Sequence, residues 1–124
     1  MARLARLVGV SFALVAASVT LSSCGTGGAV TDAKRACVYV DRALNLENQS
    51  AVPSISASAR LKLENRAIAE LVRATPYAAR ATSIDGSWNP LMTTIGEAQR
   101  VPIVQLAASL TRLCKVANSS TPYL

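Results

Sequence analysis

The sequence predicts a small all-α protein built as a helical bundle in one domain. Alanine is the commonest residue and aromatic residues make up only 4% of the chain, which favours helices packed through small side chains over a β-sandwich. Apolar residues recur at steps of three and four after residue 31, the period of an amphipathic helix. With 124 residues, 51% of them hydrophobic, the chain is long enough for one modest core.

The N-terminal residues 1–23 have the pattern of a secretory signal peptide. Two arginines and no acid precede residues 7–21, an apolar run of 15 residues. A membrane span needs about 20 apolar residues, so this run is short for a span and suits a cleaved signal.

The run ends in Leu21-Ser22-Ser23-Cys24, which resembles the lipobox of bacterial lipoproteins. The resemblance implies that the Cys24 thiol receives a diacylglyceryl group and that the signal is cut just before it. It predicts an exported protein, lipid-anchored to the outer face of the bacterial cell membrane. The alanine- and arginine-rich composition is typical of a high-GC genome such as that of an actinobacterium. The alternative is an ordinary cleaved signal that leaves Cys24 unmodified.

The mature chain is expected to contain a flexible, glycine-rich tether (24–31), a helical domain (32–117) and a loose polar tail (118–124). A first helix is predicted from Thr31 or Asp32, either of which can cap it, to about Glu47. Its apolar face carries Ala33, Cys37, Val40 and Leu44. Tyr39 and Leu46 share a second face, which is either packed between helices or free for a partner.

Three further helices are expected. The second follows a serine-rich entry at 54–58 and is broken or kinked at Pro76, with a short piece continuing to Ala81. The third starts at Asn89-Pro90, a cap followed by a first-turn proline. The fourth follows Pro102 and runs to Ala117. The apolar face expected for the second helix consists of Ala57, Leu61, Ile68, Leu71, Val72 and Thr75. That of the third consists of Leu91, Ile95 and Ala98, and that of the fourth of Ile103, Leu106, Leu110, Leu113 and Ala117.

With Cys24 lipidated, Cys37 and Cys114 remain, and an even pair in an oxidising compartment predicts a disulfide. Bridged cysteines need Cα atoms within about 7 Å. Cys37 lies near the start of the first helix and Cys114 near the end of the last, and those ends meet in an up-down bundle only if the number of helices is even. The pair therefore predicts four helices with a corner at residues 99–102. A three-helix bundle would require the last helix to bend back sharply at Pro102.

The second helix also carries a basic stripe, formed by Lys62, Arg66, Arg73 and Arg80. It either contacts anionic lipid or an acidic envelope protein, or is a solvated face in which Glu70 pairs with Arg66 and Arg73. Nucleic acid is not an expected partner, since the net charge is modest and no aromatic residues interleave the stripe.

Two single residues are further candidate binding residues. Glu64 falls inside the expected apolar face, so it should either pair with Arg42, Arg60 or Arg100 or lie in a pocket with a raised pKa. Trp88, the only tryptophan, is either an exposed binding anchor or is folded back into the core.

The sequence lacks the residues of common catalytic and metal sites. There is no histidine, three cysteines cannot form a Cys₄ zinc site, and the acids are scattered without a motif. No catalytic residue, metal or cofactor is therefore expected. The sequence favours a non-enzymatic binding module of the cell envelope; the alternative is a small lipid or amphiphile carrier with a pocket between its helices. An enzyme is the least favoured class.

Overall fold

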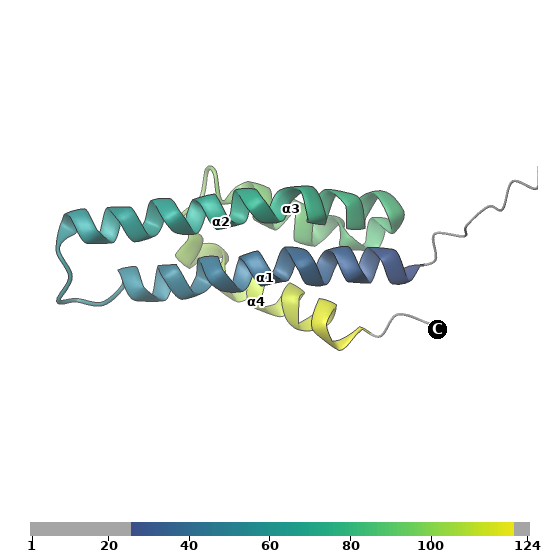
Figure 1. Ribbon diagram of the computed structural model, residues 1–124, viewed down its shortest axis with the longest axis horizontal. Helices are drawn as coiled ribbons and strands as arrows, with labels where there is room; N and C mark the ends of the chain where they lie inside the picture. The colour runs from purple at the N-terminus through teal and green to yellow at the C-terminus, as the bar shows by residue number, and fades with distance from the viewer. Residues whose placement is uncertain (1–25, 121–124) are drawn as a thin grey trace, which may run out of the picture.

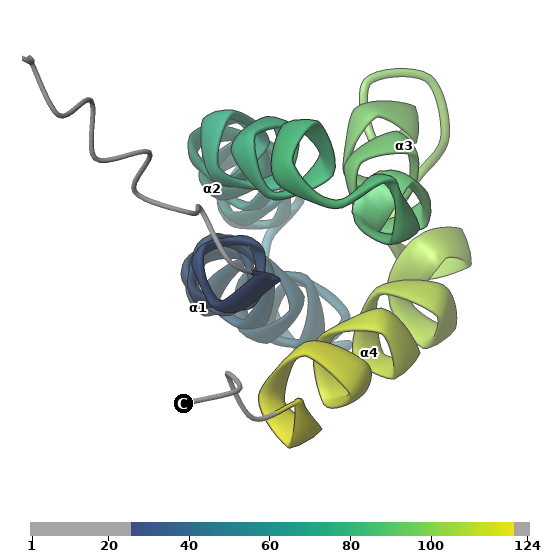
Figure 2. The ribbon, with the colours of Figure 1, turned by 90° about the vertical axis from the view of Figure 1, so that its right-hand side faces the viewer.

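The computed structural model describes residues 26–120, which form four α-helices running up and down (Figure 1). A short 3₁₀ turn, η1, precedes the third helix, and the described part contains no strand. Figure 2 shows α1 and α2 on one side of the bundle and α3 and α4 on the other. The elements are α1 (Thr26–Ser50), α2 (Ala57–Ile84), η1 (Gly86–Trp88), α3 (Asn89–Glu97) and α4 (Ile103–Ser119). The predicted four-helix bundle and its corner before Pro102 are confirmed.

A seam of small residues joins α1 and α2 into a long antiparallel hairpin. Arg80 donates a hydrogen bond of 3.0 Å to Asp32, and the rings of Tyr39 and Tyr77 stack with centroids 5.7 Å apart, which fixes the register. Because alanine side chains are short, the two helix axes can approach to about 8 Å. The seam residues alternate in steps of four and three, as in a coiled coil: Ala29, Ala33, Ala36, Val40 and Ala43 on α1, and Ala67, Leu71, Ala74, Ala78 and Ala81 on α2.

The apolar face predicted for the second helix is wrong for most of its residues. Leu61, Ile68 and Val72 are 58%, 37% and 52% exposed, and Ala57 and Thr75 are exposed as well. The prediction followed the largest apolar side chains. The buried side of α2 is instead the alanine row, which lies about a third of a turn away around the helix.

Of the two expectations at Pro76, a break or a kink, the break with a short continuation is wrong, because α2 continues past the proline. The helix runs on to Ile84 because the buried residues Ala74 and Ala78 hold both sides of the proline against the core. Proline has no backbone N–H, so the carbonyl of Val72, four residues before Pro76, has no helical donor. Both residues are exposed. Water can therefore satisfy that carbonyl, which lowers the cost of an internal proline.

Helix boundaries differ from the prediction mainly at α1. This helix begins at Thr26, so residues 26–31 are helical rather than part of a flexible tether. Ala29 and Val30 are buried and extend the seam into this segment. The helix also runs past Glu47 to Ser50, whose hydroxyl donates to the carbonyl of Glu47 at 2.7 Å. The expected signal peptide, Cys24 and residues 121–124 lie outside the described residues.

Helices α3 and α4 close the core on the side opposite the α1–α2 seam. Their predicted faces are confirmed, with Leu91, Ile95, Ala98, Ile103, Leu110 and Ala117 buried and Leu106 and Leu113 partly buried. Asn89 is the first residue of α3 and makes no side-chain cap, which corrects its predicted role. None of the described helices is both long and apolar enough to cross a bilayer.

Candidate functional site

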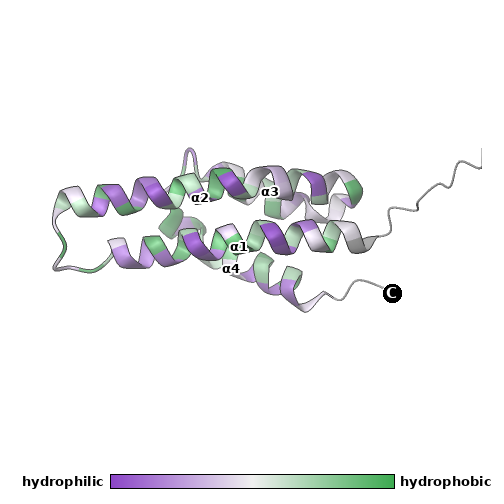
Figure 3. Cartoon of the chain, in the orientation of Figure 1, coloured by the Kyte–Doolittle hydropathy of each residue, from purple (hydrophilic) through white to green (hydrophobic). Residues whose placement is uncertain are grey.

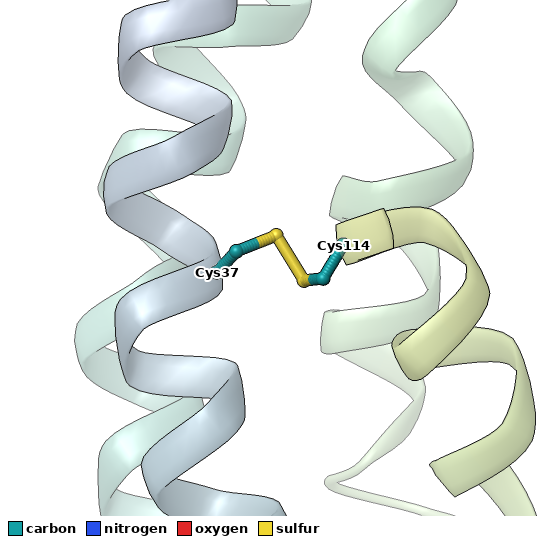
Figure 4. The surroundings of a disulfide bond; sticks show 2 residues. All are labelled: Cys37 and Cys114. Carbon is teal, nitrogen blue, oxygen red and sulfur yellow. A yellow bond between two sulfur atoms is a disulfide. The ribbon is translucent and has the colours of Figure 1, made fainter. Parts of the chain in front are cut away.

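The predicted disulfide joins α1 to α4 in the core of the bundle. Cys37 and Cys114 are bonded, with Cα atoms 5.4 Å apart (Figure 4), and both side chains are almost fully buried. Burial keeps the bond away from soluble thiols, which favours a structural role.

An open pocket of about 510 Å³ lies beside the corner that joins α3 to α4. Glu47 of α1 and Glu64 and Ile68 of α2 form one wall, and residues 98–104 form the other. Its volume falls in the range of about 300–1,000 Å³ that is usual for small-ligand pockets. The pocket combines an apolar lining with two carboxylates, so it suits a ligand or peptide that carries both an apolar group and a positive charge.

Glu64 is half-buried and lines this pocket, so the structure places it in a pocket rather than in an ion pair. No ion pair to Glu64 is present in residues 26–120: Arg100 also lines the pocket but pairs with Glu97, and Arg42 lies over a tyrosine ring. Burial, and secondarily the charge of Glu64, raises the pKa of Glu47. Glu47 was not among the predicted site residues, because the sequence marks it only as the end of the first predicted helix.

Replacing Glu47 by glutamine is expected to raise stability at neutral pH, by at most about 0.5 kcal/mol given how exposed the group is. A folded-state pKa above the usual 4.5 means that the folded protein binds the proton more tightly. The contribution of Glu47 to stability is then fully present below about pH 4.5 and is lost as pH rises through the raised pKa. Glu47→Gln should flatten this fall, as measured by urea unfolding at acidic and neutral pH.

The control for this experiment is Asp41→Asn, which removes an exposed carboxylate from the same helix. It should leave the fall in stability with pH intact. If the Glu47→Gln protein is less stable than the natural one at neutral pH, burial and repulsion by Glu64 are not the main effects on the Glu47 carboxylate.

Trp88 is buried, only 7% exposed, so its reading as an exposed binding anchor is wrong. It ends η1, which Asp85 starts by accepting a hydrogen bond of 2.9 Å from the backbone N–H of Ser87. This bond lowers the pKa of Asp85. The indole Nε1 is buried and has no hydrogen-bond partner in the described part of the chain. Trp88 therefore fills the core, the other reading of the sequence.

All four residues of the basic stripe are exposed. Arg73 pairs with Glu70 at 3.0 Å and Arg80 with Asp32 at 3.0 Å. The expected pairing of Glu70 with Arg66 does not form. Lys62 and Arg66 have no carboxylate partner within the described ranges.

Tyr39 is half-buried on α1 and stacks on Tyr77 of α2. The guanidinium of Arg42 lies 5.3 Å from the Tyr39 ring centre, and that of Arg80 lies 4.8 Å from the Tyr77 ring centre. Leu46 is half-buried and lines a shallow depression with Arg42 and other polar residues of both helices. Tyr77 was not among the predicted site residues, and Arg42 was expected only as a possible partner of Glu64, although the spacing of Tyr39 and Arg42 places both on one side of α1.

The described residues hold no group of three or more acidic, histidine or cysteine side chains that could bind a metal ion. The arrangement offers two candidate binding surfaces: a pocket lined by two carboxylates on one side and an arginine–tyrosine surface on another. No family model, curated protein or solved structure matches this chain.

Proposed function

We propose that the protein is an exported lipoprotein, anchored by a diacylglyceryl group on Cys24 to the outer face of a bacterial membrane, and that its helical domain is a non-enzymatic binding module. The observation that carries the proposal is the use of the three cysteines. Cys37 and Cys114 are bonded to each other, which supports export because disulfides persist in oxidising compartments. Cys24 is then the one thiol left for lipid.

The pocket beside the α3–α4 corner supports the binding role. Its two carboxylates, Glu47 and Glu64, face apolar walls that include Ile68 and Ile103. A basic, partly apolar segment of another envelope protein has the chemistry that this site would recognise.

The same pocket favours a second candidate function, a small carrier for a cationic amphiphile. Native mass spectrometry of the gently purified protein distinguishes the two. A bound small mass that organic solvent releases supports the carrier, whereas a bare monomer argues against it and favours a protein partner.

The anchor is tested in an exporting bacterium by labelling with a fatty-acid analogue. The natural chain should incorporate the label and enter the detergent phase, and Cys24→Ala should incorporate none. The label decides the result, because an uncleaved signal could also hold a chain at the membrane. Ser23→Ala is the matched control, since alanine keeps a small residue before the cysteine and should leave labelling intact. Label on the Cys24→Ala chain would overturn the anchor.

A further inference from the structure

The net charge of the described chain is concentrated on one face of the α1–α2 hairpin, the face turned away from α3 and α4. We call it the hairpin face. It carries six basic and two acidic residues: Arg35, Arg42, Lys62, Arg66, Arg73, Arg80, Asp32 and Glu70. The charges of the other five basic and five acidic residues of the described chain cancel one another. The hairpin face therefore holds the whole surplus of +4.

Contacts between the two helices place these residues on one surface. Arg35 lines a shallow depression with Tyr39 and Tyr77, and a second depression is lined by Arg42, Arg66 and Glu70 among others. The rest follow by helical spacing and by the ion pairs already described. Figure 3 looks onto this face and shows hydrophilic residues recurring along both helices.

The ion pairs of Arg73 with Glu70 and of Arg80 with Asp32 use both acids of the hairpin face. The remaining basic side chains have no carboxylate partner among residues 26–120, and all are exposed: Arg35, Arg42, Lys62 and Arg66. The charge surplus thus faces solvent and attracts an anionic partner.

The centre of the hairpin face is aromatic as well as basic. The stacked Tyr39 and Tyr77 lie under Arg42 and Arg80, and neighbouring Val38 is 49% exposed. Tyrosine has an apolar ring and a polar tip, and it is enriched where a protein meets the headgroup region of a membrane. The face is also long, since the 25 residues of α1 extend about 37 Å. A long basic surface with tyrosines at its centre matches a lipid surface better than a compact acidic protein.

We propose that the hairpin face binds an anionic phospholipid bilayer and lies flat on its headgroups, an inference that rests on the proposed anchor at Cys24. One residue, Gly25, separates Cys24 from the first residue of α1, so the anchor holds the start of this face beside the lipid. Each basic residue near an anionic surface strengthens the attraction roughly fivefold. The pocket, lined also by residues 98–104 of the α3–α4 side, then faces away from the bilayer toward a partner.

The test uses the lipidated protein on vesicles of phosphatidylcholine alone or of equal parts phosphatidylcholine and phosphatidylglycerol. An arginine-specific dicarbonyl modifies exposed guanidinium groups, and peptide mass spectrometry gives the rate at each arginine. Arg112, exposed on α4, is the internal reference. On the anionic vesicles, the rates at Arg35 and Arg42 relative to Arg112 should fall by about fivefold or more. High salt should restore them, because the Debye length is only about 3 Å at about 1 M salt.

A double variant, Lys62→Gln with Arg66→Gln, should weaken attachment of the face roughly 30-fold and reduce the protection of Arg35 and Arg42. The matched control, Lys34→Gln with Lys115→Gln, removes the same charge elsewhere and should keep it. An absence of protection on both kinds of vesicle would overturn the proposal and leave an acidic macromolecule as the partner. Equal protection on neutral and anionic vesicles would also overturn it. Failure of the anchor is distinct, because it appears as a chain without fatty-acid label.

Discussion

Removing the Cys37–Cys114 disulfide is expected to lower the free energy of unfolding by about 4.5 kcal/mol. The two cysteines are 77 residues apart in the chain, and closing a loop of that length in the unfolded state gives about this value in the chain-entropy treatment. A typical domain has a total stability of only about 5–15 kcal/mol. Loss of the bond should therefore leave little margin, and α4 should separate first because the bond ties it directly to α1.

The measurement is urea unfolding of the natural protein, the reduced natural protein and the Cys37→Ala, Cys114→Ala double variant. Reduction and double substitution should shift the midpoint by similar amounts if loop closure is the cause. A shift in the double variant alone would instead assign the loss to the packing of the sulfur atoms. Unchanged midpoints in both would contradict the expectation.

The helix number followed from the sequence because two of its constraints were independent of packing detail. The cysteine pair favoured an even number of helices, and Pro102 supplied the corner. The premise that Cys37 lies near the start of the first helix is wrong, because α1 begins at Thr26 and Cys37 lies near its middle. The buried faces of α3 and α4 were also predictable, since their large apolar residues, such as Leu91 and Leu110, are the ones the core takes in.

The buried face of α2 was not predictable in the same way. Its periodic large residues, Leu61, Ile68 and Val72, are exposed, and alanines form the contact instead. Periodicity within one helix defines faces but does not say which face meets a neighbour. That choice depends on how closely the partner helix approaches, which the alanines of α1 decide.

The candidate site shows the same limit. Glu64 was singled out as an ill-placed charge, but its pocket also needs Glu47 from α1 and residues 98–104 from the corner. The hairpin face likewise joins Arg35 and Arg42 to the stripe on α2, and only the register of the hairpin brings them together. Tyr39 on α1 and the stripe on α2 were predicted separately, and their meeting on one surface was not.

The alanine seam leads to the second large expected effect. Ala74→Leu should destabilise the protein by about 3 kcal/mol, at the upper end of the usual cost of overpacking a core. Ala74 is 0% exposed and lies midway along α2, where added carbon atoms cannot reach solvent. The helices must either separate or rotate, and both responses break contacts along the rest of the seam.

The matched control is Ala79→Leu, at an exposed position of the same helix. Alanine and leucine have nearly equal helix propensities, so both variants carry the same local cost and differ only in what surrounds the new side chain. Urea unfolding should show a large loss for Ala74→Leu and almost none for Ala79→Leu. Equal stabilities would mean that the seam has room for leucine and that the two helices are not held at close approach. A loss confined to Ala74→Leu would show that the seam holds the two helices at close approach, and so keeps the two halves of the hairpin face side by side.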